Sequence, residues 1–127
     1  MSDHFESRVD VPTFRKAQRA YIEAMLDDLL PPLRLAARGC GYALAVHGSL
    51  ARDIDLVAIP WTSSATSAKA LVDRLCGVIA GICGRAHPLG EWTTKPHGRQ
   101  ALIIITSGDA EIDLSIMPLG TPSEEGT

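Results

Sequence analysis

The first clear pattern in the chain is a helical spacing of apolar residues between Thr13 and Leu29. Side chains that recur every three or four residues share one face of an α-helix. Here they are Phe14, Ala17, Tyr21, Ile22, Met25, Leu26 and Leu29. Pro31 and Pro32 follow, and a proline inside a helix removes a donor and clashes with the carbonyl four residues earlier. We therefore expect a break or kink near Leu30 and a short second helix that ends at Arg38.

The remainder of the chain combines short apolar runs with one further helical pattern. Apolar residues at helical spacing predict a helix from about Thr66 to Cys83, ended by Gly84. The segment after it contains Pro88, Gly90 and Pro96 and is predicted to be a loop. Four short apolar segments bounded by turn residues are typical of β-strands, and they span residues 42–46, 53–60, 99–106 and 110–117.

The order of these elements indicates the fold class. It is helix, strand, strand, helix, strand, strand, and short connections such as Ser107-Gly108-Asp109 favour antiparallel neighbours. This predicts an α+β domain, with a mixed or antiparallel four-stranded sheet and helices packed on one face. We expect one domain over residues 1–118 and a flexible tail over 119–127, where Gly, Pro and Glu are frequent.

Composition restricts the class of protein further. The chain has 127 residues and a net charge of −3, which provides no overall attraction to nucleic acid. Cys40, Cys76 and Cys83 are an odd number without metal-site spacing, as expected of a reduced, cytoplasmic protein. The amino terminus lacks a signal-peptide pattern, and no apolar run reaches the ~18 residues of a membrane span. We therefore predict no association with a membrane.

Two aspartates interrupt the second predicted strand. Asp53 and Asp55 are two residues apart and therefore share one face of the strand. The last predicted strand repeats the pattern with Asp113. If the two strands are neighbours, three carboxylates meet and raise one another's pKa unless a cation lies among them. Oxygen ligands of this kind suit Mg²⁺ or Mn²⁺. The alternative is an open, solvated sheet face on which these acids bind no metal.

These residues resemble the signature of a known superfamily. Gly48-Ser49, the Asp-Ile-Asp-Leu strand and a later strand with Asp113 look like the DNA polymerase beta-like nucleotidyltransferases. The resemblance implies a nucleotidyltransferase-like fold in which Gly48 and Ser49 hold the phosphates of a nucleotide. It implies that Asp53 and Asp55 bind two metal ions and that Asp113 is a further ligand or a base. The implied reaction transfers a nucleotidyl group from a nucleoside triphosphate to an unknown acceptor, which is a nucleic acid, a protein or a small molecule.

A second resemblance extends over nearly the whole chain. The segments HGSLARDIDLVAIPW, KPHGR and IDLSIMP, in this order, are similar to an uncharacterised family often encoded by bacteriophages and prophages. This resemblance implies no activity beyond a suspected relationship to the nucleotidyltransferases.

A basic loop supplies candidates for phosphate binding. Lys95, His97 and Arg99 surround a proline and a glycine before the third predicted strand, and Arg52 precedes the aspartates. Arg99 suits a bidentate phosphate clamp and Lys95 a point charge on a terminal phosphate. The alternative is a solvated turn whose cations balance nearby acids. For His47, a hydrogen bond at the sheet edge and a contact with ligand both remain open.

The spacing after Ser49 favours a different function. Only Leu50, Ala51 and Arg52 separate Ser49 from Asp53. Three residues are too few for the helix N-terminus that often binds phosphate. The alternative function is therefore a non-catalytic nucleotide- or protein-binding module on the same fold. A metal-dependent nuclease, in which the same carboxylates activate water, is a weaker third hypothesis.

Overall fold

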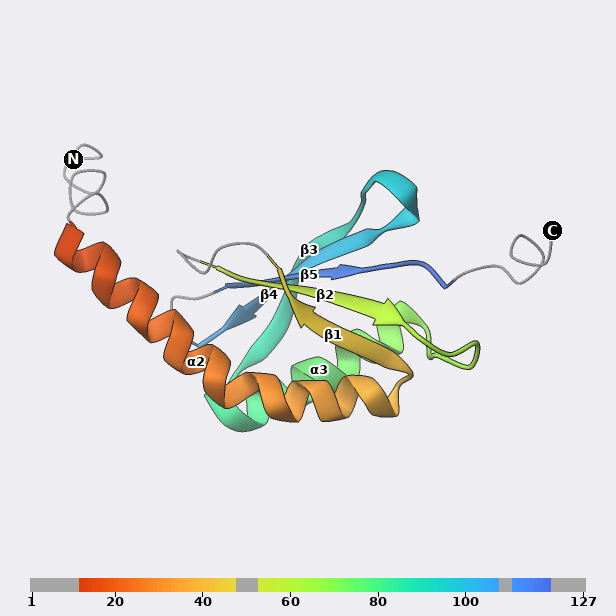
Figure 1. The fold of residues 1–127 in the computed structure, drawn as a ribbon, viewed down its shortest axis with the longest axis horizontal. Coiled ribbons are helices and arrows are strands. Elements are labelled where there is room, and N and C mark those ends of the chain that lie inside the picture. Colours follow the sequence, from red (N-terminus) through yellow and green to blue (C-terminus); the bar gives the residue numbers. More distant parts are fainter. Residues whose placement is uncertain (1–11, 48–52, 108–110, 120–127) are drawn as a thin grey trace.

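The structure is a computed structural model that describes residues 12–47, 53–107 and 111–119. Within these residues two helices pack on one face of a single sheet, as Figure 1 shows. This is the predicted α+β class. The helices are α2 (Pro12–Gly39) and α3 (Ala68–Cys83), and a short 3₁₀ turn, η1 (Pro96–Gly98), joins the third and fourth strands. The strands are β1 (Tyr42–Val46), β2 (Ile54–Pro60), β3 (Ala86–Thr94), β4 (Gln100–Thr106) and β5 (Glu111–Ile116).

The sheet is mixed, with the strand order β1-β2-β5-β4-β3. β1 and β2 form one antiparallel pair, and β3, β4 and β5 form an antiparallel ribbon. The two halves join where β2 runs parallel to β5. The strands predicted to be antiparallel neighbours, β1 with β2 and β4 with β5, are therefore paired. The last predicted strand, β5, lies next to the second, β2.

Alternating burial along the strands defines the two faces of the sheet. In β2 and β5 the side chains of Ile54, Leu56, Ile112 and Leu114 are each at most 2% exposed and face the helices. Burial of one such side chain contributes about 1.5–3 kcal/mol to folding. α2 packs against β1 and β2, whereas α3 packs against β3 and β4. In both strands the residues that alternate with the buried ones point to the opposite face of the sheet. Among the described residues, no helix covers that face.

The prediction of four strands was wrong, because residues 86–94 form β3 and not a loop. Pro88 and Gly90 disfavour a central strand, but β3 lies at the edge of the sheet, where the missing proline donor faces outward. The pairing with β4 shifts register between Leu89 and Thr93. Gly90 lies in this bulge with a φ of 72°, a conformation that glycine adopts without strain.

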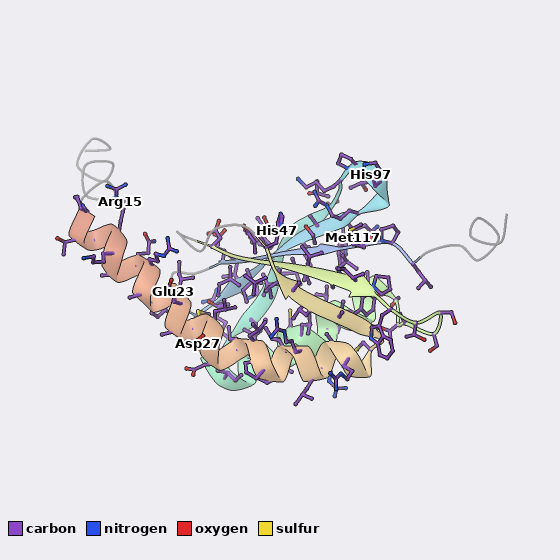
Figure 2. All side chains as sticks on the ribbon, in the orientation of Figure 1. Arg15, Glu23, Asp27, His47, His97 and Met117 are labelled. Carbon is purple, nitrogen blue, oxygen red and sulfur yellow. The ribbon has the colours of Figure 1, made fainter. Side chains whose placement is uncertain are left out.

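The predicted division into two helices was also wrong, since α2 continues through Pro31 and Pro32. The helix nevertheless bends partway along its length, near the labelled Asp27 in Figure 2. Asp27 is four residues before Pro31, so its carbonyl lacks a helical donor and meets the proline ring. Burial of Leu29 and Leu33 on either side of the prolines keeps the two segments in one helix. No helix in the described part of the chain combines the length and apolarity needed to cross a membrane.

A glycine turn connects α2 to the sheet. Gly41 has a φ of 90°, its N–H donates to the carbonyl of Arg38, and its carbonyl accepts from the N–H of Trp61. A Cβ atom at this position would lie 2.7 Å from the Cα of Ala65 and 2.8 Å from Cγ2 of Thr62. Both the backbone conformation and the available space therefore require glycine.

We predict that Gly41→Ala lowers the free energy of unfolding by roughly 2–4 kcal/mol, because it adds left-handed strain and a backbone clash. Denaturant unfolding followed by circular dichroism measures the change. Gly77→Ala is the matched control, since a Cβ there meets nothing within 4 Å in α3 and should stabilise the helix by about 0.5–1 kcal/mol. Equal stabilities for wild type and Gly41→Ala would contradict the assignment of this turn.

Candidate functional site

Two of the predicted acids lie side by side in the sheet. Asp55 of β2 is the register partner of Asp113 of β5 in the parallel pair. Neighbouring strands are about 4.8 Å apart, and partners in register point to the same face. Because Ile54 and Leu56 face the helices, both carboxylates lie on the uncovered face.

The third acid belongs to the same group. Asp53 directly precedes β2 and is exposed, and the two-residue period places it on the side of Asp55. The pKa of Asp55 is raised above its ordinary value, first by burial and then by the charges of Asp113 and Asp53. We call Asp53, Asp55 and Asp113 the acid cluster. In the described residues the ion pairs are Arg19–Glu23 and Lys69–Asp73, so no lysine or arginine there forms an ion pair with the cluster.

His47 lies beside the acid cluster, although it was not among the predicted site residues. Its backbone N–H donates to the carbonyl of Asp55 at 2.8 Å, which continues the β1–β2 ladder by one residue. Opposed residues of an antiparallel pair share a face, and the His47 charge lowers the pKa of Asp55. The hydrogen bond thus comes from the backbone, which leaves the imidazole available near the acids. Figure 2 shows His47 at the end of β1.

The basic loop lies at the end of the β3–β4 ribbon. The backbone N–H of Lys95 donates to the carbonyl of Arg99 at 2.6 Å and closes the turn. His97 has a φ of 69° and is exposed at the tip of the ribbon, as Figure 2 shows. Arg99 is half-buried, and its Nε atom is buried without a hydrogen-bond partner in the described part of the chain. An unpaired buried donor of this kind costs stability.

A cavity connects the basic loop to the acid cluster. It has a volume of about 290 Å³ and lies between β3 and the uncovered face of β4 and β5. Lys95 and Asp113 both line it, so the structure brings one predicted phosphate ligand and one predicted acid into the same cavity. Its other lining residues are Leu89, Gly90, Glu91, Thr93, Ala101, Leu102 and Ile103. The remaining phosphate candidates, Gly48, Ser49 and Arg52, lie outside the described residues.

The donors of the acid cluster suit a hard divalent cation only in part. Carboxylate oxygens are ligands that Mg²⁺ and Mn²⁺ prefer, and mutual repulsion in the cluster favours a bound cation. Among the described residues, however, no three His, Cys, Asp or Glu side chains form a ready metal-binding group. A cation here would therefore take further ligands from water or from a phosphate, as Mg²⁺ commonly does.

Comparisons with known proteins add little to this geometry. No protein-family model matches the chain, and no curated protein matches it. A solved structure described as "Structural Basis for the Activity of a Cytoplasmic RNA Terminal U-transferase" is similar at a TM-score of 0.39 and 13% identity. The similarity covers 91% of this chain and 32% of the other, so this chain spans about a third of that protein's length. A superposition this loose assigns no function to the chain.

We predict that Asp55→Asn stabilises the metal-free protein at neutral pH. The pKa of Asp55 in the folded state lies above 3.8, the ordinary value that applies to the unfolded state. The folded state therefore loses stability as the pH rises from 3.8 through the pKa of the folded state. The asparagine removes this cost. The gain should stay below about 1 kcal/mol at about pH 7 and disappear below the ordinary pKa.

Thermal unfolding in EDTA at several pH values measures this effect. Asp73→Asn is the matched control, because Asp73 pairs with Lys69 at 3.1 Å on the exposed face of α3. Loss of this carboxylate should not stabilise the protein. If Asp55→Asn unfolds at the same temperature as wild type at neutral pH, the acids do not repel one another as described.

Proposed function

We propose that the acid cluster and the adjacent cavity bind a nucleoside triphosphate with a divalent cation and transfer its nucleotidyl group to a hydroxyl acceptor. The proposal is supported by the register of Asp55 and Asp113 on the uncovered face, where no lysine or arginine of the described residues forms an ion pair with them. Carboxylates held this way by two strands favour a cation whose other ligands come from phosphate. The resemblance noted in the sequence agrees with this function.

The proposed roles of the residues are those that the resemblance to the nucleotidyltransferases implies. Asp53 and Asp55 would hold the cation, with Asp113 as a further ligand or as the base for the acceptor hydroxyl. Mg²⁺ or Mn²⁺, when bound, supplies positive charge that stabilises the phosphate oxygens. The acceptor oxygen forms a bond to the α-phosphorus, the bond to the bridging oxygen breaks, and pyrophosphate leaves. The hydroxyl proton passes to Asp113 or to water.

The basic loop would bind the triphosphate. Lys95 shares the cavity with Asp113 and places a charge near the terminal phosphates. Arg99 remains a proposed phosphate ligand through the terminal nitrogens of its guanidinium group, because its Nε is buried. His97, exposed at the ribbon tip, and Gly48, Ser49 and Arg52 remain proposed phosphate ligands from the sequence.

A non-catalytic nucleotide-binding module is the second candidate. It is favoured by the three-residue spacing between Ser49 and Asp53 and by the absence of a ready three-ligand metal group in the described residues. In that case the acids would position a cation–nucleotide complex without turnover. The two candidates share ligand binding and differ in whether a nucleotidyl group is transferred.

We predict that the wild-type protein binds a non-hydrolysable nucleoside triphosphate in the presence of Mn²⁺. Asp55→Asn and Asp113→Asn should each weaken binding roughly 10- to 100-fold, because each removes a charged oxygen ligand. Isothermal titration calorimetry with each of the four nucleotides measures this. Asp73→Asn serves as the control, as an acid of the same size on the exposed side of α3. Absence of binding by wild type would rule out both candidates.

Transfer is measured separately with α-labelled triphosphates. The acceptors offered are an RNA oligonucleotide, a DNA oligonucleotide and the protein itself. Label on an acceptor that disappears in Asp113→Asn supports the transferase. Nucleotide binding without label on these acceptors favours the non-catalytic module, and cleavage of an oligonucleotide without added triphosphate would instead indicate a nuclease.

We predict that Lys95→Met selectively weakens binding of triphosphates. The expected loss is about tenfold for a triphosphate, the usual size for one charge-assisted contact, and much smaller for the monophosphate of the same nucleoside. Lys69→Met is the control, because Lys69 is exposed on α3. An equal loss for both nucleotides would show that Lys95 does not contact the terminal phosphates.

A further inference from the structure

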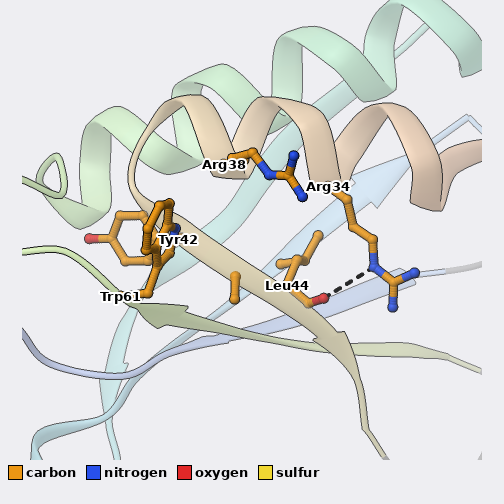
Figure 3. A pocket seen from close by; sticks show the side chains of 6 residues that line it. Arg34, Arg38, Tyr42, Leu44 and Trp61 are labelled. Carbon is orange, nitrogen blue, oxygen red and sulfur yellow. Dashed lines mark hydrogen bonds between the residues drawn. The ribbon is translucent and has the colours of Figure 1, made fainter.

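A second pocket lies at the opposite edge of the sheet, where the end of α2 passes beside β1. It has a volume of about 550 Å³, and Figure 3 shows the residues that line it. β1 is at the edge of the sheet, so the pocket borders a strand edge that no other strand of the described residues pairs with. We call it the edge pocket, and its lining residues are Arg34, Arg38, Tyr42, Ala43, Leu44 and Trp61.

Two arginines supply the charge of the edge pocket. The Nε of Arg34 donates to the carbonyl of Leu44 at 3.3 Å, which directs the side chain along the strand edge. Arg38 follows one turn later on the same helix face, and like charges at this spacing repel each other. No ion pair in the described residues involves either arginine. An anion bound by both guanidinium groups would remove the repulsion.

Two aromatic rings complete the edge pocket. Tyr42 is 4% exposed, and its hydroxyl donates to the carbonyl of Thr66 at 2.6 Å, so this ring forms a fixed wall. Trp61, by contrast, is 62% exposed and presents an indole ring to solvent. Figure 3 shows both rings at one end of the pocket and Arg34 at the other, with Arg38 between them. The pocket thus combines a flat apolar surface with two cations.

The edge pocket also reaches the uncovered face of the sheet. Ala43 lines it and pairs with Ile59, which lies on the same side of β2 as Asp55. Leu44 pairs with Ala58, three residues from Asp55, which corresponds to about 10 Å along the strand. An extended ligand can therefore pass from the edge pocket onto the face that carries the acid cluster.

We propose that the edge pocket binds single-stranded nucleic acid, with phosphate oxygens on Arg34 and Arg38 and a base stacked on Trp61. Cations beside an exposed aromatic ring are the usual means of binding single strands without sequence preference. An acidic peptide would use the arginines but would leave the exposed indole without a role. The proposal does not depend on the proposed transferase activity, because the pocket shares no residue with the acid cluster.

The test is fluorescence anisotropy of labelled poly(U) and poly(dT) oligonucleotides with the full chain. The buffer contains EDTA and no nucleotide, so the result is independent of metal binding and catalysis at the acid cluster. Titrations between about 50 and 200 mM salt give the salt dependence, which reports the number of phosphates contacted. Uridine monophosphate and a phosphotyrosine peptide are added as competitors.

We expect Trp61→Ala to weaken binding about tenfold, the loss typical of one stacked base, and Trp61→Phe to retain most of it. Arg38→Gln should reduce the slope of log affinity against log salt by about 0.7, because one phosphate contact is lost. Arg34→Lys keeps the charge and should change that slope little. The matched controls are Trp92→Ala on β3 and Arg74→Gln on α3, which should bind like wild type.

The proposal is overturned if wild type does not bind either oligonucleotide at low salt, or if Trp61→Ala and Arg38→Gln bind as well as wild type. It is also overturned if uridine monophosphate competes as strongly as unlabelled oligonucleotide, which would indicate a site for a free nucleotide. Competition by the phosphotyrosine peptide but not by unlabelled oligonucleotide would overturn it too. Circular dichroism of each variant verifies that a loss of binding is not a loss of folding.

Discussion

The parallel pairing of β2 with β5 is the constraint on which the site depends. Ile54 and Leu56 on one strand and Ile112 and Leu114 on the other are almost completely buried under the helices. A shift of either strand by one residue would turn these side chains to solvent. At about 1.5–3 kcal/mol for each side chain, this is more than a small domain can lose. The core thus fixes the register that places Asp55 beside Asp113.

The same constraint explains why the acids can remain close despite their repulsion. Repulsion between partly exposed charges costs at most about 1 kcal/mol, well below the apolar burial that holds the strands together. The fold therefore tolerates a raised pKa at Asp55 without rearranging. A cation that relieved the repulsion would bind a preformed arrangement, and its binding energy would not be spent on ordering the strands.

Local patterns predicted the parts of the fold that depend on local physics. The helical spacing that ends at Gly84 corresponds to α3. Gly84 has a φ of 90° and donates its backbone N–H to the carbonyl of Ala80. The alternation around Asp55 and Asp113 predicted which side chains share a face. The sequence does not show that residues 86–94 lie at the edge of the sheet, so Pro88 suggested a loop where β3 forms. Pro31 likewise suggested a break, although tertiary burial of the following turns keeps α2 continuous.

The candidate site, like the fold, was predictable only where it depends on local sequence patterns. The repeated Ile-Asp-Leu pattern predicted a shared acid site only on the condition that the two acidic strands are neighbours. Their parallel register depends on contacts far apart in the chain, which the pattern does not contain. Likewise, the cavity that Lys95 shares with Asp113 exists because β3 extends the sheet, which the loop prediction did not contain. His47 was left open because its position opposite Asp55 follows from the ladder alone. Since the net charge is −3, recognition of any anion has to come from such local groupings of cations, and these arise only when the strand edges are in place.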